Sequence, residues 1–363
     1  MSRPRLLLAI VLVALLLFSM FGEHAFAGTF SYYHAVLIQI GINIILGASL
    51  NLVNGYTGQF SLGHAGFMAV GAYASASWSD HVDRIFWGVL KDPALVDKLK
   101  IPAELVKALN PGGFLNPFAV NGVFLVSLLV GGLLAAFAGL IVGIPSLRLR
   151  GDYLAIMTLG FGEIIRTAIL NIDFLGASRG YNGIAPYTNL FWTYGVAAVC
   201  IYVVLVLVNS TYGRGFLTVR DDEIAAEAMG INTTKYKVIA FVIGAFFAGI
   251  AGALFAHYVG FLTPEGFNFF KSVEVVVIVV LGGMGSTAGV VLTAAMLTLL
   301  SEAQRALAHT SFVPPQYRGL LENRLILYSL LLIVFMLTRP QGLFGDLSAV
   351  RKRLTPKTAK QKT

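Results

Sequence analysis

The sequence predicts an all-α fold: a polytopic transmembrane helical bundle with about ten membrane segments, two of them short or broken. Two properties of the composition support this prediction. Of the 363 residues, 57% are hydrophobic and only 12% are charged. A soluble domain carries about twice that share of charge, so much of the apolar surface must face lipid. The third observation is that apolar stretches of spanning length recur along the chain.

The length of each apolar stretch defines the membrane segments, because a helix needs about 20 residues to cross the hydrocarbon core. A longer stretch at 271–302 is interrupted by Gly282, Gly283 and Gly285. It is either one overlong span or two short ones, at 272–283 and 286–302. Irregular backbone of this kind is tolerated only where protein or a water-filled cavity covers it. The other stretches lie near 6–22, 34–53, 64–79, 118–144, 152–170, 190–208, 237–260 and 321–338.

The charge of the loops favours two short segments. Basic residues gather around Arg3, around Arg148, in the loop 209–237 and in the tail after Thr338. These regions hold fifteen Lys and Arg residues and six acidic ones, whereas the other loops hold ten of each. Positively charged loops stay in the cytoplasm. Ten segments satisfy this pattern and place both termini on the cytoplasmic side of a bacterial-type plasma (inner) membrane.

The chain then divides into three parts. Residues 1–27 form a first membrane anchor or, alternatively, a cleaved signal peptide ending in Ala-Phe-Ala. Residues 28–345 form the transmembrane domain, with an extracytoplasmic loop at 80–117 and a cytoplasmic loop at 209–237. Residues 346–363 form a basic cytoplasmic tail.

Several classes of chemistry are missing. The chain has no phosphate-binding G-x-x-x-x-G-K-[ST] loop, no His pair spaced i,i+4 and no G-x-S-x-G motif. Its single cysteine, Cys200, cannot form an intrachain disulfide. The net charge of +8 is explained by basic cytoplasmic loops, so it does not indicate nucleic-acid binding. We therefore expect a protein of the lipid bilayer that is not an enzyme and has no metal, no cofactor and no nucleic-acid partner.

Two glycine-rich segments are candidates for a solute path. Residues 51–71 contain five glycines among uncharged polar residues, and residues 281–289 contain four more. Glycine lets helices approach closely, and neutral polar groups offer hydrogen bonds without a formal charge. The alternative is ordinary loop and helix packing. The candidate path residues are Asn51, Asn54, Tyr56, Gln59, Ser61, His64, Gly283 and Ser286.

Four ionisable residues fall within or beside spans. Glu163 and Arg166 are spaced i,i+3 on one helix, so we expect them to form an ion pair. Glu274 lies near the outer end of its segment, where we expect an interfacial position. His257 comes late in its span, and we expect its ring to reach the interface.

The loop 209–237 predicts a short cytoplasmic helix. An acidic cluster begins it, strong helix formers follow, and Gly230 ends it. Such a helix suits a groove on a soluble partner, although a solvated loop helix is the alternative. The candidate coupling residues are Asp221, Asp222, Glu223, Ala225, Ala226, Glu227 and Gly230.

This loop resembles the coupling loop of binding-protein-dependent ABC permeases, whose pattern is Glu-Ala-Ala, three residues, then Gly. Ala225, Ala226 and Gly230 match, while Ile224 occupies the position of the Glu. Further motifs resemble the LivM subunit family of branched-chain amino acid permeases, and the resemblance runs from about 40 to 345. These motifs are Gly55-Tyr56-Thr57-Gly58, Ser61-Leu62-Gly63-His64, the segments 147–155 and 158–163, and Leu281-Gly282-Gly283-Met284-Gly285-Ser286.

The resemblance implies a permease subunit that forms the translocation path of an ABC importer for branched-chain amino acids. It implies as partners two ABC ATPase subunits, which hydrolyse ATP, a homologous LivH-like permease subunit, and a periplasmic or surface solute-binding protein. Urea and short-amide permeases of the same family carry similar motifs. A gradient-driven secondary transporter is a further alternative, and it would depend on Glu163 or Glu274. A membrane receptor or scaffold would transport no solute.

Overall fold

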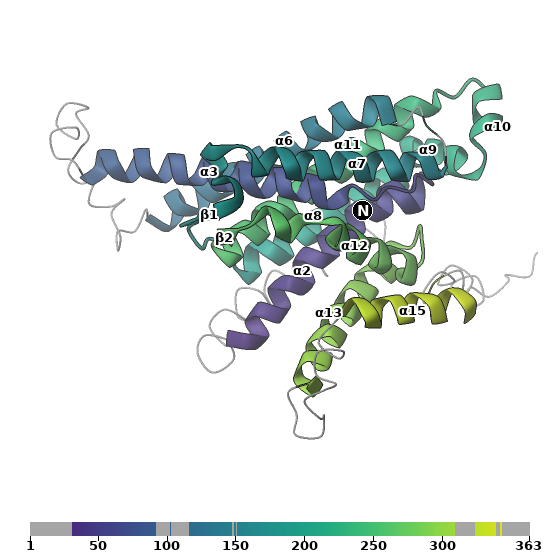
Figure 1. Cartoon of the computed structure of the whole chain (residues 1–363). Coiled ribbons are helices and arrows are strands. Elements are labelled where there is room, and N and C mark those ends of the chain that lie inside the picture. The colour runs from purple at the N-terminus through teal and green to yellow at the C-terminus, as the bar shows by residue number, and fades with distance from the viewer. Residues whose placement is uncertain are drawn as a thin grey trace, which may run out of the picture.

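The computed structural model describes residues 31–91, 116–146, 151–308 and 324–338, and the single positions 102, 149 and 342 (Figure 1). The predicted segment 1–27, most of the outer loop and the tail 346–363 lie outside the described residues.

Helices account for most of the described chain. In order, the elements are α2 (Ser31–Asn51), the π-helix η1 (Leu52–Tyr56), α3 (His64–Lys91), α6 (Asn116–Ser146), α7 (Asp152–Leu170), the 3-10 helices η2 (Asp173–Leu175) and η3 (Ala177–Arg179), β1 (Tyr181–Asn182), α8 (Leu190–Val208), α9 (Thr211–Asp221), α10 (Glu223–Ala228), α11 (Thr233–Val259), β2 (Phe261–Leu262), the 3-10 helix η4 (Pro264–Phe267), α12 (Phe269–Gly282), α13 (Thr287–Ala308) and α15 (Arg324–Thr338).

Six of the described helices are long and apolar enough to cross a membrane, which confirms an all-α, polytopic membrane protein. The helices α12 and α15 have 14 and 15 residues, so they are too short to be counted among these six. The predicted break in 271–302 is present, because α12 ends at Gly282 and α13 begins at Thr287. The prediction that both halves are short is wrong for the second, since α13 has 22 residues. The total of about ten segments stays a prediction.

The outer loop begins later than its predicted start at residue 80, because α3 continues to Lys91. An ion pair spaced i,i+4, between Arg84 and Asp80 at 2.7 Å, lies on this continuation. Such pairs support a helix beyond its apolar part. Hydropathy marks the end of the apolar stretch, whereas the helix itself ends twelve residues after position 79.

The core forms where α3, α6 and α11 cross, and glycines allow the crossing. A Cβ added at Gly71 of α3 would lie 2.1 Å from the carbonyl oxygen of Gly249 in α11, and one at Gly131 of α6 would lie 2.7 Å from the carbonyl oxygen of Gly71. Any larger residue would force these helices apart. The backbones therefore meet directly, as in packed membrane helices.

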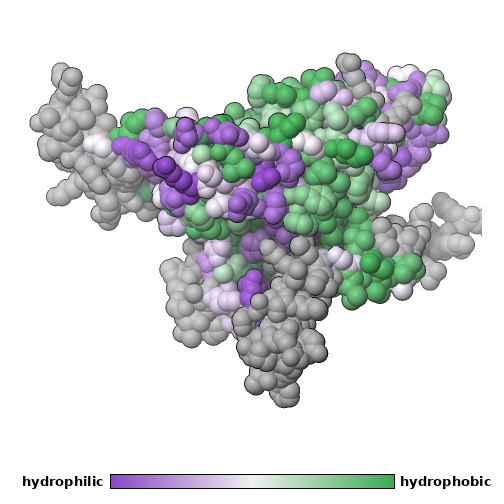
Figure 2. Space-filling view, viewed as in Figure 1, coloured by the Kyte–Doolittle hydropathy of each residue, from purple (hydrophilic) through white to green (hydrophobic). Residues whose placement is uncertain are grey.

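Large apolar side chains cover much of the outside of the bundle. Leu133 and Phe137 of α6 and Ile164 of α7 are each about 60% exposed. Figure 2 shows hydrophobic residues over broad parts of this face, and hydrophilic residues both at the end formed by α9 and α10 and toward the opposite end. An apolar exterior of this kind suits lipid or another membrane subunit.

The loops group at two opposite ends of the bundle (Figure 1). At one end, a common cavity of about 350 Å³ is lined by residues 57–60, by residues 219–223, and by Leu149, Gly151, Asp152 and Leu154. At the other end, β1 pairs antiparallel with β2, and the Tyr181 hydroxyl donates to Asp80 at 2.8 Å. This grouping agrees with the alternation of loops between the two sides of a membrane.

Candidate functional site

The first glycine-rich segment is a break between α2 and α3. The last five residues of the first span form a π-helix, and residues 57–63 are irregular before α3 begins at His64. Side chains replace the missing helical bonds: Asn54 Oδ1 accepts from the Ser61 N–H at 3.2 Å, and the Thr57 hydroxyl donates to the Val53 carbonyl at 2.6 Å. Because π-helices often occur at functional sites, this break is a candidate functional element.

The second break lies between α12 and α13. Gly283 and Gly285 have positive φ angles of 95° and 85°, which only glycine adopts easily. The Ser286 side chain then accepts from the Gly289 N–H at 3.2 Å and begins α13. The roles of Gly283 and Ser286 seen here are therefore to end one helix and to start the next.

The two breaks meet, although they are far apart in the sequence. Asn51 Oδ1 accepts a hydrogen bond from the Gly285 N–H at 2.9 Å, and the Tyr56 hydroxyl lies 2.8 Å from the Thr287 hydroxyl. A Cβ added at Gly55 would lie 2.3 Å from the Gly285 nitrogen. The structure thus joins the two predicted path segments in one junction.

The candidate path side chains of the first break are all buried. Gln59 donates to Thr57 at 2.9 Å, and His64 lies 2.8 Å from the Ser49 hydroxyl of α2. Three amide atoms have no hydrogen-bond partner among the described residues: Asn51 Nδ2, Asn54 Nδ2 and Gln59 Oε1. Buried polar atoms of this kind are rare, and they commonly bind water or a ligand.

Arg220, at the end of α9, connects the junction to the surface. Its Nη1 lies 3.4 Å from the Gly55 carbonyl oxygen, and its side chain contacts Gly58. It also pairs with Asp221 at 2.9 Å. In the sequence Arg220 is one of several basic loop residues, and no local pattern distinguishes it from the others.

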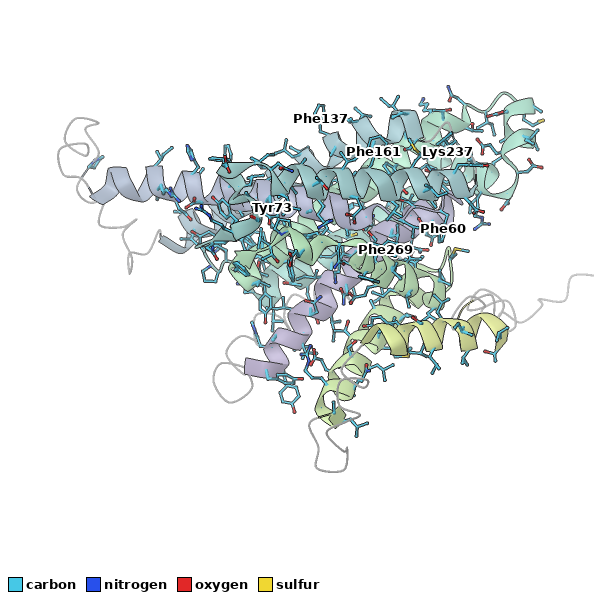
Figure 3. The ribbon with its side chains drawn as sticks, in the orientation of Figure 1. Phe60, Tyr73, Phe137, Phe161, Lys237 and Phe269 are labelled. Carbon is cyan, nitrogen blue, oxygen red and sulfur yellow. The ribbon has the colours of Figure 1, made fainter. Side chains whose placement is uncertain are left out.

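The predicted short helix is α10, and its acidic residues bind its own chain. Asp222 caps the helix by accepting from the Ile224 and Ala225 N–H groups at 2.9 and 3.0 Å. Glu223 pairs with Lys237 of α11 at 2.5 Å, and Glu227 accepts from Thr233 at 2.9 Å. Lys237 is nearly buried (Figure 3).

The exposed part of α10 is therefore largely apolar. Ile224 is 68% exposed and Met229 is 81% exposed, while Ala226 is buried against the body. Gly230 ends this segment with a φ of +81°, and nothing lies within 4 Å of the Cβ position. Ile224 and Met229 thus form a small exposed apolar patch beside charged residues at one end of the bundle.

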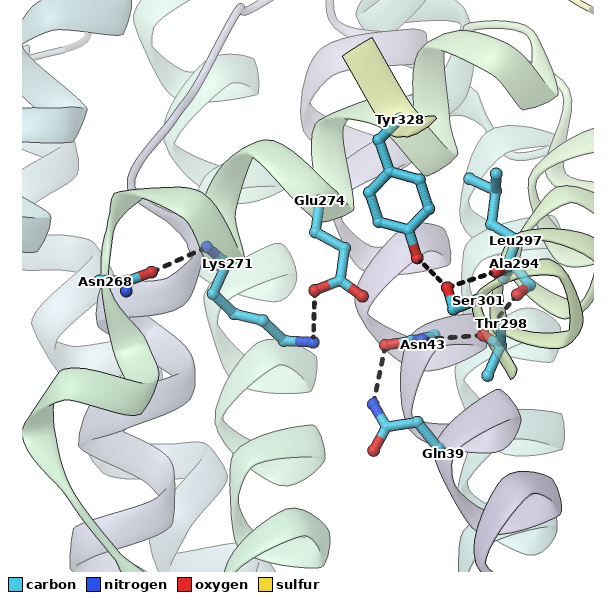
Figure 4. Close-up of polar contacts among 10 residues, drawn as sticks. All are labelled: Gln39, Asn43, Asn268, Lys271, Glu274, Ala294, Leu297, Thr298, Ser301 and Tyr328. Carbon is cyan, nitrogen blue, oxygen red and sulfur yellow. Dashed lines mark hydrogen bonds and ion pairs between the residues drawn. The ribbon is translucent and has the colours of Figure 1, made fainter. Parts of the chain in front are cut away.

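The ion pairs within the helices differ in environment. Arg166 and Glu163 pair at 2.7 Å, as predicted, and they keep 27% and 39% of their side-chain surface exposed. They lie on α7 and are not part of the junction. Lys271 and Glu274 pair at 3.2 Å on α12 with only 14% and 8% exposed (Figure 4). Glu274 is therefore enclosed by neighbouring helices near the start of α12, and its expected position at the membrane interface stays a prediction.

The expectation for His257 is wrong. Its side chain is buried, its Nδ1 lies 2.9 Å from the Ala185 carbonyl oxygen, and its Nε2 lies 3.1 Å from the Ser75 hydroxyl. The ring stacks on Tyr187, with centroids 5.5 Å apart. Because neighbouring elements satisfy both ring nitrogens, the ring has no need to reach the interface.

The described residues contain no group of three His, Cys, Asp or Glu side chains arranged to hold a metal ion. The site contains a buried junction of two helix breaks and an arginine that contacts one of them. The exposed helix α10 follows that arginine in the chain. This arrangement can transmit a movement from the surface into the bundle.

Comparison with known proteins assigns the chain to a family. The family described as "Branched-chain amino acid transport system / permease component" matches residues 32–336. The branched-chain amino acid transport permease protein LivM of Salmonella typhimurium is 34% identical over 337 residues, covering 83% of this chain and 67% of the relative. The LivM protein of Escherichia coli is 33% identical over the same shares.

A more distant relative is LivH of Salmonella typhimurium, 24% identical over 191 residues, with 52% of this chain and 58% of the relative covered. No solved structure matches the chain. The family match over residues 32–336, together with a relative that is 34% identical over 83% of this chain, shows that this chain belongs to the branched-chain amino acid transport system permease family.

Proposed function

We propose that this chain is the transmembrane permease subunit of a binding-protein-dependent ABC importer for branched-chain amino acids. Two relatives of similar sequence carry branched-chain amino acid transport in their names. The observation that supports the mechanism most strongly is the contact of Arg220 with Gly55, because it links the loop of α10 to the break between α2 and α3.

In this proposal α10 docks on a cytoplasmic ATPase. Its exposed Ile224 and Met229 fill an apolar groove of the partner, while Glu223 and Glu227 hold the helix to α11. Among the candidate coupling residues, Glu223 and Glu227 thus anchor the helix. The apolar contact face is formed by Ile224 and Met229, which the sequence did not single out. Gly230 allows the turn that follows α10.

ATP binding to the partners shifts the permease between outward-open and inward-open arrangements. ATP must bind the two arrangements with different affinity, since a ligand shifts an equilibrium only through such a difference. Movement of α10 and α9 displaces Arg220, which contacts the break at Gly55. The break at 283–286 follows through the bond between Asn51 and Gly285.

The solute path passes beside this junction. The unpartnered amide atoms of Asn51, Asn54 and Gln59 offer hydrogen bonds to a polar solute or to water that follows it. Tyr56 and His64 hold the walls on either side of the break, bonded to Thr287 and Ser49.

The complete importer contains two ABC ATPase subunits, a homologous LivH-like permease subunit and a periplasmic or surface solute-binding protein. ATP is hydrolysed in the ATPase subunits. The chain lies in a bacterial inner membrane with about ten segments, and both termini are cytoplasmic if residues 1–27 are retained. The end with α9 and α10 then faces the cytoplasm.

Transport by the reconstituted importer tests the proposal. This chain is placed in proteoliposomes with candidate ATPases, the second permease and the binding protein, and labelled leucine and urea are offered separately. ATP-dependent leucine accumulation that disappears without the binding protein is the expected result. Uptake of urea but not of leucine would contradict the proposed solute class. Leucine flux through this chain without ATP would instead identify a gradient-driven carrier.

A matched pair of variants tests the role of α10. Met229→Asp places a charge on the proposed contact face, and we expect lower ATPase binding and lower uptake. Ile85→Asp places the same charge on α3 at the opposite end of the bundle, where Ile85 is 59% exposed, and we expect no change in ATPase binding. Equal effects of the two variants would contradict docking through α10.

A further inference from the structure

The ion pair of Lys271 and Glu274 lies inside the bundle. Glu274 is eight residues before the last residue of α12, which places it ~12 Å from the break at 1.5 Å per residue. In the turn between them, the Ser272 hydroxyl accepts from the Ala65 N–H of α3 at 3.1 Å. The pair is thus enclosed by neighbouring helices near the start of α12, away from the break.

Figure 4 draws neutral hydrogen-bonding side chains of α2, α13 and α15 on the Glu274 side of the pair. Asn43 donates to the Thr298 hydroxyl at 3.0 Å, and Gln39 donates to Asn43 at 3.3 Å. Ser301 and Tyr328 share a hydrogen bond of 2.5 Å. Such groups stabilise a polar ligand without adding a net charge.

Stability alone does not explain a buried ion pair. Removing two charges from water costs several kcal/mol per ion, and apolar replacements of such pairs are often neutral or stabilising. Ionisable residues within membrane segments therefore usually indicate a solute or ion pathway. The pair of Glu163 and Arg166 is partly exposed, so its charges lose less hydration.

We propose that Lys271 and Glu274 bind the charged groups of an amino acid during its passage, and this proposal rests on the function proposed above. The Lys271 ammonium pairs with the solute α-carboxylate, and the Glu274 carboxylate pairs with the solute α-ammonium. The internal ion pair opens, and two ion pairs replace it.

The exchange conserves net charge. A zwitterion compensates both side chains, so no uncompensated charge stays buried at any stage. Urea or a short amide offers only dipoles and cannot replace either partner of the pair. A solute with a single charge leaves one side chain unpaired. The pair therefore selects amino acids over the amide solutes of related permeases.

Neutralising both charges distinguishes solute binding from a structural role. The double variant Lys271→Gln with Glu274→Gln leaves no unpaired charge, so a purely structural pair predicts normal assembly and normal transport. We expect normal assembly, an unchanged thermal midpoint and retained ATPase stimulation by loaded binding protein, but leucine uptake reduced by about ten-fold or more, since each charged hydrogen bond to the solute is lost.

The matched control is Glu302→Gln with Arg305→Gln, which removes an exposed i,i+3 pair on the neighbouring α13. We expect wild-type uptake from it. If the glutamine double variant does not assemble, Lys271→Met with Glu274→Met takes its place, because it fills the same site with apolar side chains. Normal leucine uptake by an assembled double variant would overturn the inference.

The wild-type importer separates this inference from the proposed function. Leucine uptake by the wild type together with normal uptake by the double variant refutes only the role of the ion pair. If the wild type imports urea and not leucine, both proposals fail, since an uncharged solute has no use for the pair.

Discussion

Replacing Gly55 by alanine is the sharpest test of the junction between the two breaks. The added Cβ would lie 2.1 Å from Asn51 Oδ1 and 2.3 Å from the Gly285 nitrogen. Both contacts are closer than atoms can approach, and the second atom belongs to the backbone. The two breaks must therefore separate, and the bond between Asn51 and Gly285 is lost.

The magnitude follows from three contributions. A lost bond between buried groups costs about 1–3 kcal/mol, and overpacking of a tight contact costs about 1–3 kcal/mol. Alanine regains about 0.5–1 kcal/mol over glycine in a helical conformation. We expect Gly55→Ala to destabilise the chain by about 2–4 kcal/mol.

The assay is thermal unfolding of the full chain in detergent, compared with Gly160→Ala. Gly160 lies in α7, and nothing lies within 4 Å of its Cβ position. We expect Gly160→Ala to raise stability by about 0.5–1 kcal/mol. If the two variants unfold at the same temperature, the breaks are not in contact and the reasoning about the junction is refuted.

Three further predictions concern the two ends of the bundle. Glu223→Gln leaves the nearly buried Lys237 unpaired and should lower the free energy of unfolding by about 3–5 kcal/mol. Thermal unfolding should show that adding Lys237→Met restores this stability, and a double variant as unstable as Glu223→Gln would refute the pairing. Gly230→Ala forces a side chain into positive φ at a cost of about 1–2 kcal/mol, and it should uncouple ATP hydrolysis from transport while the protein still inserts; coupled transport would contradict this. Burial and the hydrogen bond to Asp80 raise the pKa of Tyr181 to about 12. The stability it contributes is therefore present below pH 10 and is lost as pH rises through 12, so the difference between wild type and Tyr181→Phe in unfolding scans should vanish over that range.

The positions of the helices were predictable from the sequence because hydrophobic length is a local property. The stretches 152–170 and 190–208 match α7 and α8 residue for residue. The break at 283–286 was predictable because splitting the stretch reconciled loop charge with the number of crossings. The ion pair of Glu163 and Arg166 was predictable because residues spaced i,i+3 share a helix face.

The predictions for single polar residues near the ends of helices were less successful. His257 was expected to reach the interface, but its ring is buried. The burial of Glu274 was not predicted either, while its position along the membrane normal stays a prediction. Their burial depends on which helices pack over them, and hydropathy carries no such information. The acids of α10 likewise bind Lys237 and Thr233, which lie in the next helix.

The sequence by itself determined the class of protein, the approximate helices and the two glycine breaks, because each depends on residues close together in the chain. Only the tertiary structure decided that the breaks meet, that Arg220 contacts one of them, and that Lys271 and Glu274 are enclosed. The bond between Asn51 and Gly285 joins residues 234 positions apart. Contacts over such distances depend on how helices pack, and no local pattern encodes them.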